Sequence, residues 1–184
     1  MRSLKGIFSL PLLAVHPKFF RKIFPERITG TDLMQSICAM SCEKKIPIFL
    51  LGAKPSVAEK AQRALEIRYH GIRIVGTFSG SPSEDDFPAI QAAIAEAQPE
   101  ILFVAYGSPA QELWIAKHLH ELKSVKIAMG VGGAFDFISG VRKRAPAWMQ
   151  KLGLEWLYRL AQEPSRIKRI WNAAVKFPIK IIRS

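Results

Sequence analysis

The segment from Ile46 to Phe78 reads IPIFLLGAKPSVAEKAQRALEIRYHGIRIVGTF, and its pattern predicts a strand, a helix and a second strand. The apolar run over 46–51 stops at a glycine, as a short buried strand does. Ser56–Glu59 forms a capping-box pattern, which predicts a helix that starts there and runs to about residue 69. A second apolar run over 72–78 predicts the next strand. Such a unit predicts two parallel strands joined by a crossover helix.

The same alternation continues on both sides of this unit. A helical pattern follows Thr31 ahead of the first strand, and the acidic run Glu84–Asp86 places negative charge in the first turn of the helix after the second strand. Further strands are predicted over 101–106 and 126–131. Between them, Ser108–Gln111 reads as a helix start with Ser as the cap and Pro at the first helical position. The sequence therefore predicts an α/β fold, a doubly wound parallel sheet with helices on both faces.

Composition and charge narrow the choice of partners. The chain has 184 residues, 49% of them hydrophobic, and a formal net charge of +12, which together predict a packed globular protein with a basic surface region. No acidic residue precedes Glu26, and residues 140–184 hold eleven basic against two acidic side chains. A near-neutral body with basic ends favours phosphate groups or a lipid headgroup surface. A nucleic-acid-binding protein would carry a more uniformly basic surface.

The cysteines and the hydropathy indicate the compartment. Cys38 and Cys42 lie four residues apart on one face of a predicted helix, where a disulfide between them is awkward, so we expect buried, reduced thiols. No other ligands complete a metal site, and we expect neither a metal nor a cofactor. No apolar run approaches the roughly 20 residues of a membrane span. These observations predict a cytoplasmic protein.

Three loops rich in small residues are expected to meet at the carboxyl edge of the sheet, where ligands of such folds bind. They cover residues 52–56, 107–112 and 130–136. Each loop can direct backbone N–H groups towards an anion, although each taken alone reads more readily as a plain turn. None is a Walker loop or a complete dinucleotide fingerprint. Together they predict a nucleotide site.

A C-terminal appendage over 145–184 is expected to follow an α/β domain over 1–144. The pattern predicts a helix over 145–161 that breaks at Pro164. Beyond the break, aliphatic residues alternate with Lys and Arg as in a basic amphipathic helix, which predicts binding to an anionic surface.

Three arginines in the appendage are candidates for anion binding. Arg159, Arg166 and Arg169 are seven and three residues apart, so they would share one side if the helix continued. They would then either bind a diphosphate through bidentate guanidinium contacts or form a solvated charged face.

Several motifs follow one another in a fixed order along the chain. They are TGTDL at 29–33, LGAKP at 51–55, GSPAQE at 107–112, GVGGAFD at 130–136, RAPAW at 144–148, GLEWLYRL at 153–160 and EPSRIKR at 163–169. In this combination the chain closely resembles the WecB/TagA/CpsF glycosyltransferase family over about residues 24–171. The combination is far more specific than any single loop.

The resemblance implies an inverting transferase that moves an N-acetylmannosamine-type sugar, or its uronic acid, from UDP to undecaprenyl-diphosphate-linked N-acetylglucosamine. Such bacterial enzymes make teichoic acid linkage units or enterobacterial common antigen, without a catalytic metal, at the cytoplasmic face of the membrane. The implied partners are a UDP-sugar donor, a lipid-diphosphate-linked acceptor and the anionic membrane surface. Nucleic acid is not an expected partner, and homo-oligomerisation is left open.

Site residues follow from the match to the family's motifs. The resemblance implies substrate binding by Thr29, Gly52, Gly107, Gln111, Glu112, Gly132, Gly133, Asp136, Arg159, Arg166 and Arg169. We expect the uridine diphosphate between loops 107–112 and 130–136, with Gln111 and Asp136 bonded to the donor sugar or the nucleoside. Without a metal, the arginines would neutralise the leaving diphosphate.

One feature of the family has no match in this sequence. An Asp-Gly segment lies shortly before the Thr-Gly-x-Asp-Leu motif in the family, and its Asp is the proposed general base. Here Glu26 is the first acidic residue, so we expect an N-terminally truncated chain in which Asp32, Asp136 or another group replaces the base. Asp32 is the catalytic candidate nearest in sequence, although its place inside a helix start favours a capping role. The alternative is a non-catalytic remnant that binds UDP-sugar or lipid.

Overall fold

The computed structural model describes residues 29–146, 148–149, 152, 154–164 and 167. Within this part of the chain, residues up to Lys143 belong to one compact unit and those from Arg144 onwards to a second. The first unit contains every described strand. The C-terminal appendage as a separate functional domain remains a prediction.

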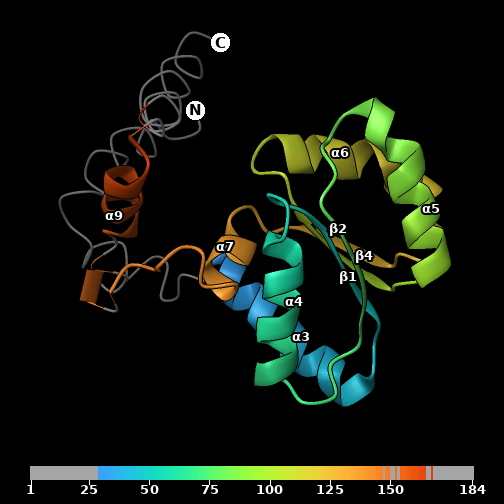
Figure 1. Cartoon of the computed structure of the whole chain (residues 1–184), viewed down its shortest axis with the longest axis horizontal. Helices are drawn as coiled ribbons and strands as arrows, with labels where there is room; N and C mark the ends of the chain where they lie inside the picture. The colour runs from blue at the N-terminus through green and yellow to red at the C-terminus, as the bar shows by residue number, and fades with distance from the viewer. Residues whose placement is uncertain (1–28, 147, 150–151, 153, 165–166, 168–184) are drawn as a thin grey trace, which may run out of the picture. The chain divides into compact units, whose positions relative to one another are not determined.

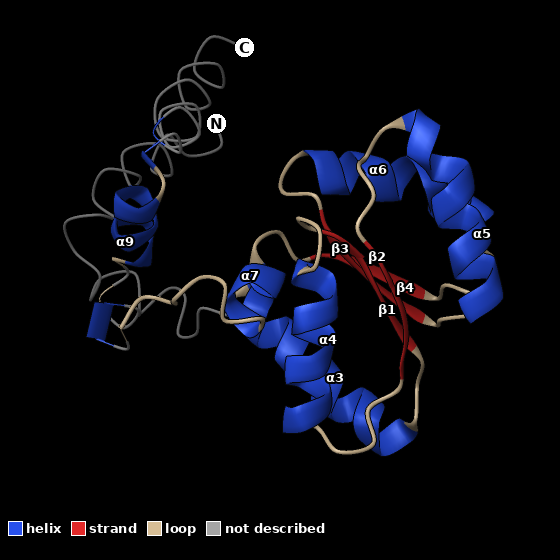
Figure 2. Ribbon diagram, viewed as in Figure 1, coloured by secondary structure: helices blue, strands red, loops and turns tan. Residues whose placement is uncertain are grey.

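The sheet has four strands, all parallel, in the order β2-β1-β3-β4 (Figure 2). Their bounds are Ile48–Gly52 for β1, Ile74–Phe78 for β2, Ile101–Ala105 for β3 and Ile127–Gly130 for β4. From β1 the chain passes to β2 at one edge of the sheet. It then returns past β1 to β3 and β4, which makes the sheet doubly wound. The predicted fold class is confirmed, and the predicted strands differ from the observed ones by at most two residues at either end.

The central strands have no exposed face. Every residue of β1 and β3 is buried, as expected for parallel strands that are covered by helices on both sides. Because side chains alternate along a strand, each strand supplies two separate cores. Leu50 and Phe103, opposite each other in the register, belong to one core, while Phe49 and Leu102 belong to the other.

Helices cover the two faces unequally (Figure 1). One face carries α3 (Gly30–Lys44), α4 (Val57–Arg68) and the short α7 (Ala134–Ile138), which pack on Leu50 and Phe103. The other face carries α5 (Phe87–Ala97) and α6 (Ala110–His118). This distribution follows from right-handed crossovers, because the direction of travel across the sheet reverses after β2.

Two predicted helix caps are wrong, although the helices exist. Ser56 precedes α4 with φ 65°, in the left-handed region, and makes no side-chain cap bond. A side chain caps from an extended backbone, so this conformation prevents the capping box. At α6 the helix begins at Ala110, and Pro109 occupies the cap position instead of the first helical position. The Gln111 N–H, which a Ser108 cap would bond, donates to the Gly107 carbonyl at 3.0 Å instead.

The helix expected over 145–161 is interrupted. Ala145 and Pro146 are not helical, Trp148 and Met149 are, and α9 (Glu155–Gln162) begins after a turn. The N–H of Leu154 donates to the carbonyl of Met149, five residues earlier. Such a bond is typical of a helix that ends at a glycine, and residue 153, just before Leu154, is a glycine. The predicted end before Pro164 is confirmed. The basic helix expected after it lies outside the described residues except for Ile167.

The two cysteines lie on α3 as predicted, both with free thiols. Cys38 is fully buried in the α3–α4 core, and burial raises the pKa of its thiol from 9.0 to about 12. Cys42 is half-buried, and its thiol donates to the His70 carbonyl at 3.0 Å.

We predict that only Cys42 reacts with iodoacetamide in the native protein between pH 7 and 10. Cys38 stays protonated and inaccessible, because its folded-state pKa lies above this range. Mass spectrometry of the alkylated protein should show one label when native and two when denatured. A native Cys42→Ser variant should stay unlabelled, and labelling of its Cys38 at the denatured rate would contradict the prediction.

We also predict that Phe103→Ala lowers the free energy of unfolding by about 3–5 kcal/mol, because it leaves a cavity between β3 and the α3–α4–α7 layer. Urea unfolding measures the change. Ile67→Ala, at an α4 position that is 76% exposed, is the matched control and should change the free energy by less than about 0.5 kcal/mol. A loss below 1 kcal/mol for Phe103→Ala would be inconsistent with this core.

Candidate functional site

The three glycine-rich loops meet at the carboxyl edge of the sheet, as predicted. The Ala53 N–H donates to the Ala105 carbonyl at 3.2 Å, joining the end of β1 to the end of β3. The Val131 N–H donates to Val104 at 2.8 Å, joining the end of β4 to β3. The fold also reverses direction between β1 and β3, with α4 on one face and α6 on the other. Ligands of open α/β sheets bind at such a switch point.

The loop after β1 is set by a close approach to the loop after β3. Gly52 has φ +93°, and a Cβ there would lie 2.8 Å from the Tyr106 ring. Ala53 and Ser56 also have positive φ, which is uncommon for residues with side chains and concentrates at functional sites. The glycine is evident from the sequence, whereas no sequence pattern indicates a positive φ at the other two positions. Lys54 is exposed on this loop, beside the start of α4.

Gln111 connects the loops after β3 and β4. Its side-chain Oε1 accepts the Gly107 N–H at 3.1 Å and the Gly132 N–H at 2.9 Å, while its Nε2 donates to Glu112 Oε1 at 2.9 Å. Gln111 is only 5% exposed, whereas Glu112 is exposed. The sequence identified both residues as site candidates, but the bridge depends on side-chain placement that spacing alone does not predict.

The glycines of the β4 loop leave room for this amide. A Cβ on Gly130 would lie 2.5 Å from Gln111 Nε2, so no larger residue fits without moving the amide. Gly132 adopts φ +54°, and Gly133 immediately precedes α7. Short α7, which sequence analysis did not predict, carries Asp136 on its first turn.

Asp136 lies next to the β4 loop. Its Oδ2 is 3.6 Å from Arg142 Nε and 3.6 Å from the position of a Cβ on Gly133. Both side chains of the ion pair are partly exposed, at 20% for Asp136 and 29% for Arg142. A carboxylate is therefore presented beside two glycine loops with a guanidinium in reach, an arrangement that can bind hydroxyl and phosphate groups together.

Thr29 and Asp32 form the N-terminal cap of α3. The Thr29 hydroxyl accepts the Asp32 N–H at 3.2 Å and donates to Asp32 Oδ2 at 2.6 Å. Because α3 runs opposite to β1, this end of the helix points towards the carboxyl edge (Figure 1). The capping interpretation of Asp32 thus has direct structural support, and its role as a catalytic base stays a prediction.

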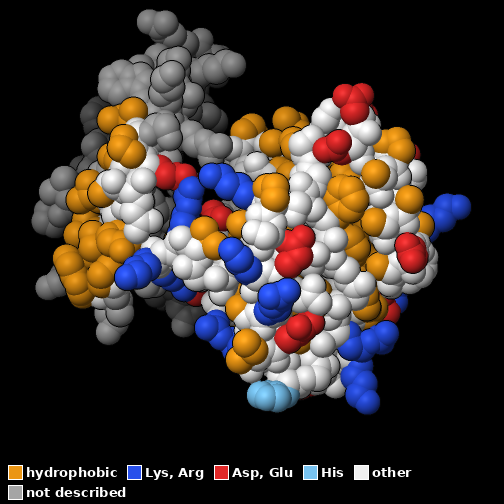
Figure 3. All heavy atoms as spheres, in the orientation of Figure 1, with side chains coloured by type: hydrophobic (Ala, Val, Ile, Leu, Met, Phe, Trp, Pro, Cys, Tyr) orange, Lys and Arg blue, Asp and Glu red, His pale blue; other side chains and the backbone are white. Residues whose placement is uncertain are grey.

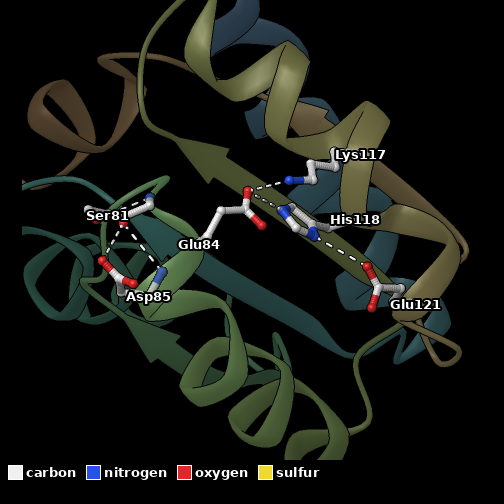
Figure 4. Close-up of polar contacts among 7 residues, drawn as sticks. Ser81, Glu84, Asp85, Lys117, His118 and Glu121 are labelled. Atoms are coloured by element: carbon white, nitrogen blue, oxygen red, sulfur yellow. Dashed lines mark hydrogen bonds and ion pairs between the residues drawn. The ribbon is translucent and has the colours of Figure 1, made fainter.

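A second polar cluster lies between α6 and the loop after β2 (Figure 4). Buried His118 stacks on Phe87 and has Glu84 Oε1 at 3.5 Å from Nε2 and Glu121 Oε1 at 3.4 Å from Nδ1. The Lys117 ammonium, 2.7 Å from Glu84, holds the pKa of that carboxyl below its usual value. The cluster fastens the β2–α5 loop to α6, so His118 has a structural role here.

The acidic run at 84–86 is a 3-10 turn directly ahead of α5. Ser83 caps it by accepting the Asp85 N–H, and Asp86 accepts the Ser81 N–H at 2.7 Å. This backbone bond lowers the pKa of Asp86. The run therefore serves helix initiation as predicted, one turn earlier than the α-helix itself.

The predicted arginine cluster is described only in part. Arg159 belongs to α9, whereas Arg166 and Arg169 lie outside the described residues. Among described residues no group of three or more His, Cys, Asp or Glu side chains is placed to hold a metal ion. In the same part of the chain, no helix is long and apolar enough to cross a membrane.

Charge on the α/β unit is mixed. Figure 3 shows Lys and Arg side chains interspersed with Asp and Glu over its visible face, without a continuous basic surface. This agrees with the near-neutral body inferred from the sequence.

Comparison with protein families identifies the chain. Residues 12–184 match the model of the WecG/TagA/CpsF glycosyl transferase family. This match covers the carboxyl-edge loops, the Gln111 bridge and α9, and it confirms the resemblance inferred from the motifs. The chain therefore belongs to the WecG/TagA/CpsF family of glycosyltransferases, which act in cell-surface polysaccharide synthesis.

Proposed function

We propose that this protein is an inverting, metal-independent glycosyltransferase that moves an N-acetylmannosamine-type sugar from UDP to undecaprenyl-diphosphate-linked N-acetylglucosamine. The observation that carries the proposal is the pair of loops 107–112 and 130–136, which Gln111 joins at the carboxyl edge in a member of this family. Backbone N–H groups and the starts of α4 and α6 at this edge suit an anionic nucleotide.

The donor would lie across these loops. Gly52, Gly107, Gly132 and Gly133 allow a ligand to approach the backbone closely, since they have no side chains. Glu112 and Asp136 offer carboxylate oxygens to hydroxyl groups of the ribose or the donor sugar. The Arg142 guanidinium, 3.6 Å from Asp136, adds positive charge at the same edge.

The acceptor and the membrane would be bound from the C-terminal side. Arg159, Arg166 and Arg169 would stabilise the diphosphate charge that develops as UDP leaves, in place of a metal. The basic residues over 165–184 would hold the protein at the anionic cytoplasmic face of the membrane, since each Lys or Arg near such a surface contributes about 1 kcal/mol.

In the transfer, an acceptor hydroxyl oxygen forms a bond to the anomeric carbon as the bond from that carbon to the UDP oxygen breaks. The hydroxyl proton passes to a base, which contributes about 10²- to 10⁴-fold in rate. Asp32 and Asp136 are the two candidate carboxylates for this step, and the capping bonds between Thr29 and Asp32 favour Asp136. Asp32 accepts a hydrogen bond from the Thr29 hydroxyl and so serves the helix cap. This favours the second candidate function, a protein that binds UDP-sugar without transferring it at a useful rate.

We predict that the protein binds UDP and that Asp136→Ala weakens this binding about 10- to 150-fold, because a charged hydrogen bond to the ligand is lost. Isothermal titration calorimetry measures the affinity, and transfer from UDP-N-acetylmannosamine to a lipid-linked acceptor tests the activity. The control is Glu96→Ala, which removes an exposed carboxylate near the C-terminal end of α5, away from the carboxyl-edge loops. It should leave the affinity unchanged. Equal affinities in wild type and Asp136→Ala would remove Asp136 from the donor site.

We further predict that Asp32→Asn keeps the transfer rate within about tenfold of wild type, since asparagine retains an oxygen for the Thr29 hydroxyl. Thr29→Ala should lower the free energy of unfolding by about 1 kcal/mol through loss of the cap. Initial rates and urea unfolding provide the two measurements. A fall of 10²-fold or more in Asp32→Asn, with stability unchanged, would instead make Asp32 the general base.

A further inference from the structure

We propose that Gln111 is a positioning residue, which sets the spacing of the two donor loops and orients Glu112, and that it does not itself bind the donor. The link to the donor rests on the proposed function, whereas the bridge itself is a property of the fold. The proposal replaces the direct contact that the motif match implies for this residue.

The hydrogen-bonding capacity of Gln111 is largely used within the protein. An amide oxygen has two lone pairs, and Oε1 accepts from Gly107 and Gly132 at 3.1 and 2.9 Å. One Nε2 hydrogen goes to Glu112 at 2.9 Å. With the residue 5% exposed, a ligand would find no free acceptor on this side chain.

The two bonds at Oε1 join loops that follow different strands. Gly107 comes after β3 and Gly132 after β4, so a single oxygen fixes how far apart these backbone segments lie. Gly130 supplies the required space, because a Cβ there would meet Gln111 Nε2 at 2.5 Å, Cδ at 2.7 Å and Cγ at 2.8 Å. The backbone of Gly130 does not have a positive φ, so alanine would disturb the amide and not the local conformation.

Gln111 also determines which oxygen Glu112 presents. Oε1 of Glu112 is held by the amide, and Oε2 makes no hydrogen bond within the described part of the chain. Glu112 is exposed on the first turn of α6, so this oxygen is available to a hydroxyl group of the donor. Loop spacing and carboxylate orientation are therefore both consequences of one buried amide.

Four variants separate these effects. Gln111→Ala removes both, whereas Gln111→Glu keeps the acceptor for the two N–H groups but repels Glu112. The exchange Gln111→Glu with Glu112→Gln rebuilds the contact with the polarity reversed. Gly130→Ala displaces the amide without removing it. Gln62→Ala is the matched control, because Gln62 donates to Glu66 at 2.8 Å in the same way on the exposed side of α4.

Amide hydrogen exchange by NMR tests the bridge without any ligand. Gly107 and Gly132 should exchange at least about 10-fold faster in Gln111→Ala and remain protected in Gln111→Glu and in the exchanged pair. The Gln62→Ala control should leave both rates unchanged. Unchanged protection in Gln111→Ala would overturn the bridge, and thermal unfolding of each variant verifies that it is folded.

UDP affinity by calorimetry tests the positioning role. We expect about a 10-fold or larger loss in Gln111→Ala and in Gly130→Ala, and no further loss when the two are combined. Affinity that falls in Gln111→Ala but is unaffected by Gly130→Ala would show a direct contact and overturn the proposal. Absence of UDP binding by the wild type would refute the proposed donor, and with it the positioning role. The amide hydrogen-exchange rates of Gly107 and Gly132 would still establish or refute the bridge.

Discussion

The need to bury both faces of a parallel sheet determines the rest of this structure. β1 and β3 are apolar at nearly every position and fully buried, so neither face can remain in water. Helices must therefore cover both sides, and right-handed crossovers then place α4 on one face and α5 and α6 on the other. Because all four strands run in the same direction, the loops that follow them emerge at one edge.

The site at this edge is built mainly from backbone. Gly52 accommodates the Tyr106 ring, and Gly130 accommodates the Gln111 amide, so the absence of side chains allows neighbouring loops to approach one another. The same absence of side chains leaves N–H groups accessible to an anionic ligand. Polar side chains then stand at the margins of the glycine loops, with Glu112 on α6 and Asp136 on α7.

Charge is divided unevenly between the two parts of the chain. The α/β unit carries mixed charge, whereas residues 140–184 hold eleven basic and two acidic side chains. Fixed dipoles and guanidinium groups near a leaving diphosphate stabilise its charge most where water is excluded. Under the proposed function, the neutral unit would provide specificity and the basic region would provide attraction to phosphate and to the membrane.

The sequence by itself determined the fold class, the order of elements, the position of the three loops and the family, because these depend on hydrophobic periodicity and on glycine spacing along the chain. It was wrong about the caps at Ser56 and Ser108 and about an unbroken helix over 145–161, because Ser56 has a left-handed backbone, Pro109 takes the cap position and a turn precedes α9. Only the tertiary structure decided that Gln111 bonds to Gly107 and Gly132 together, and that Gly130 lies against it. The bond to Gly132 spans 21 residues and depends on where one buried side chain of α6 lies relative to the loop after β4, which no local pattern encodes.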